Sequence, residues 1–190
     1  MNCRLLVVIL LGGLGCSAQS SDAPARQDSA AEDSRYKIVT TTAMVTDIVR
    51  QVSGDRANVE GLMGTGVDPH LFRPATSDHA KLYAADIIFY SGLMLEGGLD
   101  AVLKKAGARG KPAFAVTEEI DPDYIEYSAQ FAGHPDPHVW NDVSAWSECV
   151  AFVALKLSEF DPPHADEYRE NAERYRAELA ELHAYARQVI

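Results

Sequence analysis

The feature that most constrains the fold is the alternation of short β-rich runs with helical stretches from residue 36 onward. The runs are "YKIVTTT", "ANVEGLM", "DIIFYSG" and "KPAFAVT". Between the first two, Val45, Ile48, Val49 and Val52 recur on one face of a helix. Strands that alternate with helices indicate a parallel sheet wrapped by helices. The sequence therefore predicts an α/β fold.

A long helix is predicted for residues 161–190. After Pro162 and Pro163, apolar residues recur every seven positions in two interleaved series, which together form one stripe. The series are Tyr168, Tyr175, Leu182 and Val189, and Ala172, Leu179 and Ala186. A helix of about 27 residues would be roughly 40 Å long. No cap, glycine or proline follows the pattern, so we expect an element that continues beyond Ile190.

The N-terminus predicts export. Arg4 precedes an apolar run over residues 5–14, which is of signal-peptide length and shorter than the roughly 20 residues that span a bilayer. Residues 1–15 are therefore predicted to be a signal peptide. "GLGC" resembles a bacterial lipoprotein signal, with cleavage before Cys16 and lipid on its sulfur. Because Gly13 replaces the usual aliphatic residue, a plain secretory signal is the alternative, and both place the protein outside the cytoplasm.

Residues 16–35 are predicted to be a lipid anchor and a disordered tether, since this stretch is rich in Ser, Ala, Asp and Gln and lacks large hydrophobic residues. The net charge is −11, and no cluster of Lys and Arg offers a basic face, which excludes nucleic acid as an expected partner. Loss of Cys3 with the signal and acylation of Cys16 would leave Cys149 alone. Cys149 lies in an apolar helical stripe and is predicted to be a small core residue.

One tripeptide, Asp-Pro-His, occurs in both "GVDPHLF" and "PDPHVWND". Proline stiffens each loop and so lowers the entropy that His70 or His138 would lose on binding a metal. His70 follows a predicted strand and His138 precedes a predicted helix, so both can reach the edge where parallel sheets bind ligands. Asp68 and Asp136 could order the loops or hold the second ring nitrogen.

The alternative for each motif is an Asx-Pro turn that happens to end in histidine. Two copies with similar flanks favour coordination. Two ligands do not complete a site, because zinc usually takes four and manganese takes more. Two prolines separate His134 from His138 and rule out a helical i,i+4 pair, so His134 is not favoured as a ligand. His79, His164 and His183 are expected to be solvated. The remaining ligands are expected from outside this segment.

Motifs of catalysis are missing from the sequence. It contains no His-Glu-x-x-His helix, no Gly-x-Ser-x-Gly elbow, no phosphate loop and no dinucleotide fingerprint. We therefore expect a binding protein and not an enzyme.

The sequence resembles a known family, the zinc/manganese solute-binding lipoproteins of bacterial ABC importers. The segment "GVDPHLFRPATSDHAKLYAADIIFYSGLMLEGGL" is similar to the first-ligand region of that family, and "DPHVWNDVSAW" is similar to its second. The resemblance covers nearly all of the chain after Tyr36, with the same order, spacing and flanks.

The resemblance implies two α/β lobes joined by a long rigid helix, with the metal between the lobes. His70 and His138 would be the two ligands of the N-terminal lobe, residues 36–160, and residues 161–190 would begin the connecting helix. The family's other ligands, a His or Glu and an Asp, lie in a C-terminal lobe that we expect to be absent. The chain would then be a fragment or truncated product, or the second lobe would be encoded separately. We expect weak metal binding without closure of the lobes.

The function implied is capture of Mn²⁺ or Zn²⁺ in the periplasm or at the outer face of the cytoplasmic membrane. A lipid-anchored monomer would deliver the metal to an inner-membrane ABC permease and its ATPase. Zinc-dedicated members often carry a His-rich loop, whereas residues 118–134 contain one histidine, which favours manganese or mixed use. The alternatives are a surface adhesin or interaction lipoprotein, and a secreted metal-dependent hydrolase with a water-activating carboxylate.

Overall fold

Residues 35–127 and 133–189 are described by a computed structural model of the chain. The predicted signal peptide (residues 1–15), Cys16 and nearly all of the predicted tether lie outside these residues. The terminal residue 190 also lies outside them.

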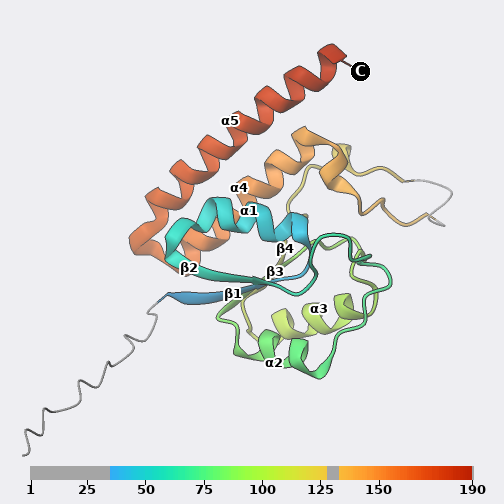
Figure 1. Cartoon of the computed structure of the whole chain (residues 1–190), viewed down its shortest axis with the longest axis vertical. Helices are drawn as coiled ribbons and strands as arrows, with labels where there is room; N and C mark the ends of the chain where they lie inside the picture. Colours follow the sequence, from blue (N-terminus) through green and yellow to red (C-terminus); the bar gives the residue numbers. More distant parts are fainter. Residues whose placement is uncertain (1–34, 128–132, 190) are drawn as a thin grey trace, which may run out of the picture. The chain divides into compact units, whose positions relative to one another are not determined.

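A parallel sheet forms the centre of the described chain (Figure 1). Its strands are β1 (Tyr36–Thr40), β2 (Ala57–Gly61), β3 (Ile87–Tyr90) and β4 (Ala113–Ala115), in the spatial order β2-β1-β3-β4. Ile38 of β1 is in register with Val59 of β2 on one side and Ile87 of β3 on the other. The predicted parallel sheet is confirmed.

Helices cover both faces of the sheet. They are α1 (Ala43–Ser53), α2 (Thr76–Ala84), α3 (Asp100–Ala108), α4 (Val143–Phe160) and α5 (Ala165–Val189). Short 3₁₀ turns include η2 (Gly97–Leu99), η3 (Pro122–Tyr124), η5 (Val139–Asn141) and η6 (Pro162–His164). Figure 1 shows α2 and α3 on one face and α1, α4 and α5 on the other. The strand order reverses between β1 and β3, as in doubly wound folds.

Among the described helices, none has the length and apolar character needed to cross a membrane.

Alternate residues of the strands fill two separate cores. Ile38 and Phe89 belong to the core shared with α1, α4 and α5, whereas Val39 and Ile88 belong to the core shared with α2 and α3. Burial on both faces explains why β3 is a continuous apolar run in the sequence. Cys149 is fully buried in the first core, as predicted, and desolvation raises the pKa of its thiol to about 12.

The start of α4 is fixed by a side-chain cap. Oδ1 of Asp142 accepts hydrogen bonds from the backbone N–H groups of Ser144 at 2.8 Å and Ala145 at 3.2 Å. This N-cap satisfies donors that the first turn of a helix leaves free. The backbone N–H of Asp142 also donates to the carbonyl of Val139 at 3.1 Å, at the end of the turn η5, which begins directly after His138.

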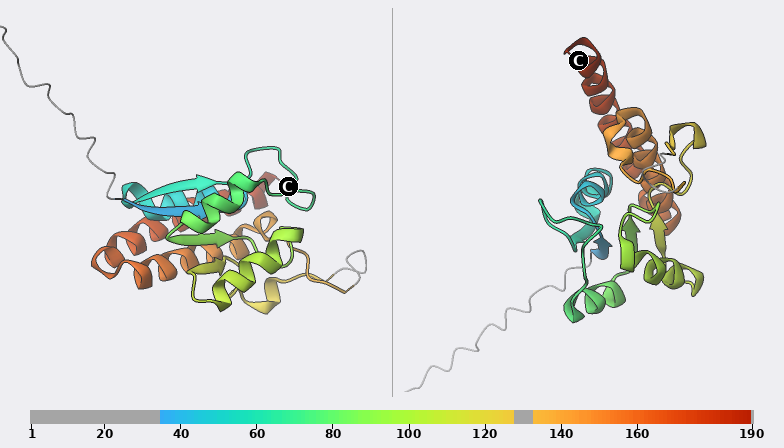
Figure 2. Two further views of the ribbon diagram at one scale, coloured as in Figure 1. Left: turned by 90° about the horizontal axis from the view of Figure 1, so that it is seen from below. Right: turned by 90° about the vertical axis from the view of Figure 1, so that its right-hand side faces the viewer.

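The long helix predicted near the C-terminus is confirmed as α5, which packs on α4 and α1. Its apolar stripe is only partly buried. Tyr168, Ala172 and Leu179 are buried, whereas Leu182 is 52% exposed and Val189 is 59% exposed. Figure 2 shows the C-terminal turns of α5 running past the other helices. The single buried face expected from the heptad pattern therefore ends near Leu179.

A polar network ties the start of β1 to the start of α5. Tyr168 donates to Oδ2 of Asp161 at 2.5 Å, and its hydroxyl oxygen accepts from Tyr36 at 2.9 Å. Nδ1 of His164 lies 2.8 Å from the same carboxylate oxygen. The side chain of His164 is 38% exposed, in agreement with the expectation that it is solvated, and it also contacts Asp161 between α4 and α5.

Candidate metal site

The first Asp-Pro-His loop extends from β2 across the end of β1. The backbone N–H groups of Leu62 and Met63 donate to the carbonyls of Thr40 and Thr41 at 2.8 and 2.9 Å. The backbone N–H of His70 then donates to Oδ1 of Asp68 at 2.9 Å. This is an Asx turn, and the proline within it restricts the backbone further.

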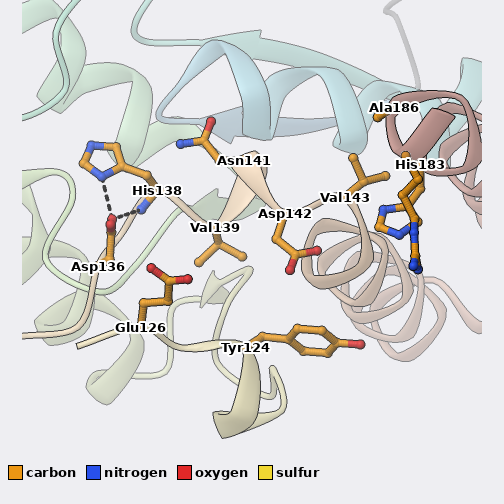
Figure 3. A pocket seen from close by; sticks show the side chains of 11 residues that line it. Tyr124, Glu126, Asp136, His138, Val139, Asn141, Asp142, Val143, His183 and Ala186 are labelled. Carbon is orange, nitrogen blue, oxygen red and sulfur yellow. Dashed lines mark hydrogen bonds and ion pairs between the residues drawn. The ribbon is translucent and has the colours of Figure 1, made fainter. Parts of the chain in front are cut away.

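The second Asp-Pro-His loop holds its histidine at two points (Figure 3). Oδ1 of Asp136 accepts from the backbone N–H of His138 at 2.9 Å and lies 2.6 Å from ring Nδ1. The backbone hydrogen bond from His138 is the largest cause that lowers the pKa of Asp136; desolvation opposes it, and the contact with the imidazole lowers the pKa further. Since the ionised carboxylate takes a proton donor at Nδ1, this contact favours the tautomer of His138 whose lone pair is on Nε2.

The structure brings His70 and His138 together, although they are 68 residues apart in the sequence. Their Nε2 atoms are separated by 3.3 Å, and the ring centroids are 5.3 Å apart. Two nitrogens bound to one Zn²⁺ at roughly 2.0–2.1 Å with tetrahedral geometry lie about 3.4 Å apart. The 3.3 Å separation is within hydrogen-bond distance, and it is also close to the separation of two nitrogens bound to one Zn²⁺.

The aromatic residue two positions after each histidine anchors its loop. Phe72 packs against the core beneath α2 and α3, whereas Trp140 packs against the core beneath α1 and α4. The ring of Trp140 also meets that of His138 edge-on, with centroids 5.2 Å apart. The repeated aromatic position thus joins the two loops to opposite faces of the sheet.

The remaining histidines do not join the pair. His79 is exposed, as expected, and His134 is exposed as well. His183, which was expected to be solvated, is partly exposed and lines an open cavity of about 630 Å³ that is also lined by Asp136 and His138. Figure 3 shows His183 on α5 at the opposite end of that cavity from His138. Within residues 35–127 and 133–189, no group of three or more His, Cys, Asp or Glu side chains is arranged to hold a metal ion.

One charged residue at this edge was missed by the sequence reasoning. Glu96 follows β3 and is fully buried. Burial raises the pKa of its carboxyl group, although hydrogen bonds from Thr41, Ser91 and Gly92 oppose that shift. The available clue was an acidic residue within the otherwise apolar run "GLMLEGGL", because charged residues are rarely buried without a partner.

The fold and the site together define a class of protein: an α/β lobe that presents a preorganised histidine pair at the carboxyl edge of a parallel sheet. Residues 38–190 match the family described as "Zinc-uptake complex component A periplasmic". The chain therefore belongs to this family. The predicted family and fold class are confirmed.

Individual relatives agree with this assignment. The chain is 34% identical to the manganese-binding lipoprotein MntA of Bacillus subtilis (strain 168), over 93% of the chain and 55% of MntA. It is 32% identical to the manganese ABC transporter substrate-binding lipoprotein PsaA of Streptococcus pneumoniae, over 97% of the chain and 58% of PsaA. The structure of the periplasmic zinc-binding protein TroA from Treponema pallidum superposes with a TM-score of 0.75 at 35% identity, over 81% of the chain and 55% of TroA.

The chain spans little more than half the length of these relatives, 55% of MntA and 58% of PsaA. Their names describe metal-binding and transport proteins and not enzymes. The similarity covers both Asp-Pro-His loops, because the family match runs from residue 38 to residue 190.

Proposed function

We propose that this protein captures a divalent transition metal, Mn²⁺ or Zn²⁺, on His70 and His138 and delivers it to the permease of an ABC importer. The observation that carries the proposal is the 3.3 Å separation of the two Nε2 atoms on stiff loops at the carboxyl edge of the sheet. Membership of a metal-uptake family supports it. Relatives named for manganese and for zinc binding support either ion as the cargo.

Asp68 and Asp136 have different roles in the proposed site. Asp136 contacts the ring of His138 and thereby selects the tautomer that presents Nε2 to the metal. Asp68 orders the loop through the backbone of His70. With two imidazoles as protein ligands and water completing the coordination shell, the 190-residue chain binds metal weakly. The pair alone prefers Zn²⁺ to Mn²⁺, because zinc stands higher in the Irving–Williams order and imidazole suits it better.

The cellular setting belongs to the same proposal. Residues 1–15 direct export, Cys16 carries the lipid, and residues 16–35 tether the lobe of residues 36–160 to the membrane. The helix of residues 161–190 is the connecting helix of the family. The protein then acts as an extracytoplasmic monomer that binds metal and performs no catalysis, with the permease and its ATPase as partners.

The binding step is tested by titrating the chain with Zn²⁺ and Mn²⁺ in a calorimeter. His70→Ala, His138→Ala and the double variant are compared with the original chain, and each single change is expected to remove most of the binding. His79→Ala is the matched control, since His79 is an exposed histidine on α2. Unchanged binding by the double variant would contradict the proposal.

The delivery step is tested in cells that carry the permease and ATPase. Uptake of radioactive manganese or zinc is measured with the original chain and with the double histidine variant. Uptake that depends on both histidines supports delivery, whereas equal uptake with the two chains rejects it.

A further inference from the structure

Glu96 connects the ends of the two strands at which the sheet order reverses. Its Oε1 atom accepts from Oγ1 of Thr41 at 2.7 Å and from the backbone N–H of Ser91 at 2.6 Å. Its Oε2 atom accepts from the backbone N–H of Gly92 at 3.2 Å. Thr41 directly follows β1, and Ser91 and Gly92 directly follow β3. A single buried carboxylate therefore fixes both strand ends, and each of these contacts is a donor.

The turn that contains Glu96 has an unfavourable backbone. Leu93 and Met94 have φ angles of 51° and 66°, and Gly92 and Gly97 have φ angles of 88° and 49°. Left-handed backbone is costly for residues with a side chain, and it persists where the surrounding structure imposes it. Here the hydrogen bonds of Glu96 to the start of the turn supply that restraint.

The same turn contacts the first histidine loop. Gly97 follows Glu96 directly, and a Cβ atom placed on Gly97 would lie 3.2 Å from the backbone carbonyl oxygen of His70. The backbone at Gly97 therefore packs closely against the backbone of His70. By contrast, a Cβ atom on Gly98 would have no neighbour within 4 Å.

We infer that Glu96 is a positioning residue for the metal site. It holds the turn of residues 92–97, the turn supports the backbone of His70, and that support directs Nε2 of His70 toward Nε2 of His138. This inference rests on the proposed metal-binding function, because its main measurement is metal affinity.

The first test uses two neighbouring glycines of η2. Gly97→Ala places a methyl group against the carbonyl of His70 and also strains the backbone, because φ of Gly97 is 49°, whereas Gly98→Ala places the same group in open space without that strain. Titration with Zn²⁺ is expected to show an affinity loss of about 10-fold for Gly97→Ala, the lower end of the effect of outer-shell changes at metal sites. Gly98→Ala is expected to bind like the original chain. Equal affinities for the two variants would overturn the inference.

The second test is Glu96→Gln, which keeps the shape of the side chain and turns an NH₂ group toward the N–H of Gly92. We expect weaker Zn²⁺ binding and a change in the ¹⁵N resonances of the His70 ring, with the His138 ring unchanged. A purely structural role would lower the melting temperature while the folded protein kept its affinity and its His70 resonances, and that result would overturn the inference.

Failure of the two proposals can be told apart. If His70→Ala with His138→Ala leaves Zn²⁺ binding unchanged, the proposed function fails, and the His70 resonances of Glu96→Gln still decide the positioning role. If the double variant loses binding while Gly97→Ala and Glu96→Gln retain it, only the positioning role fails.

Discussion

One carboxylate oxygen of Asp136 contacts both the backbone and the ring of His138. Its Oδ1 atom accepts from the backbone N–H at 2.9 Å and lies 2.6 Å from ring Nδ1. In the first loop, Asp68 accepts from the backbone N–H of His70 at 2.9 Å. The two copies of Asp-Pro-His thus share a turn, and Asp136 additionally orients an imidazole.

This difference predicts unequal effects of the same substitution. Asn retains an oxygen that can accept from the backbone, so both Asp136→Asn and Asp68→Asn keep the turn. Asp136→Asn loses the charge that orients and polarises the ring of His138, and Zn²⁺ affinity is expected to fall by about 10–100-fold. Asp68→Asn is expected to cost less than about 3-fold, because its contact is with the backbone. Zn²⁺ titration of both variants checks this, and equal losses would contradict it.

Much of the fold could be predicted because it depends on local pattern. The alternation of β-rich runs with helical stretches indicated a parallel sheet wrapped by helices, and the helical spacing of the apolar residues from Val45 to Val52 indicated the face that α1 buries. The pairing of His70 with His138 could be anticipated because the carboxyl ends of parallel strands share one edge. The stiff tripeptides then placed both rings at that edge.

Long-range features could not be predicted from these patterns. Glu96 bonds to Thr41, which lies 55 residues away, so no local signal identifies the contact. The heptad series of α5 indicates which face is apolar, but it contains no information on where the neighbouring helices stop. For that reason the sequence did not separate the buried Leu179 from the exposed Leu182.

The different exposure of Leu179 and Leu182 on α5 predicts different losses of stability when each leucine is replaced by alanine. Leu179 is 7% exposed within the first core, whereas Leu182 is 52% exposed three residues later. Leu179→Ala is expected to lower the free energy of unfolding by about 2–4 kcal/mol, because it removes buried contacts and leaves a cavity. Leu182→Ala is expected to change it by no more than about 0.5 kcal/mol. Urea unfolding of the two variants measures both values, and similar losses would show that the C-terminal turns of α5 are also buried.

The Tyr168–Asp161 contact predicts a pH dependence of stability. Partial burial of Asp161 opposes ionisation, but hydrogen bonds from Tyr168 and His164 outweigh it and hold the pKa of this carboxyl below its ordinary value. A folded-state pKa below the unfolded value of about 3.9 means that the ionised group stabilises the fold above that pH. The stabilisation is lost as the pH falls through the lower, folded-state pKa.

Asp161→Asn is therefore expected to lower the free energy of unfolding by about 1–2 kcal/mol at neutral pH. The difference from the original chain should shrink as the pH falls below about 4. Urea unfolding across this pH range is the measurement. Asp166→Asn serves as the control, since the side chain of Asp166 is 91% exposed and its ion pair with Arg169 lies at the surface. A difference for Asp161→Asn that stays constant with pH would contradict the expectation.

The last prediction concerns the N-terminal segment outside the described residues. If Cys16 carries the lipid, Cys16→Ala removes the acyl chains that hold the protein at the membrane, since membrane binding grows with each buried methylene group. The variant is expected to lose labelling by a fatty acid analogue and to leave the membrane fraction. Cys3→Ala is the matched control, because Cys3 lies within the predicted signal peptide and its loss should change neither labelling nor membrane association. A Cys16→Ala protein that remains labelled would exclude Cys16 as the lipid site, and an original chain that is exported without label would favour the plain secretory signal.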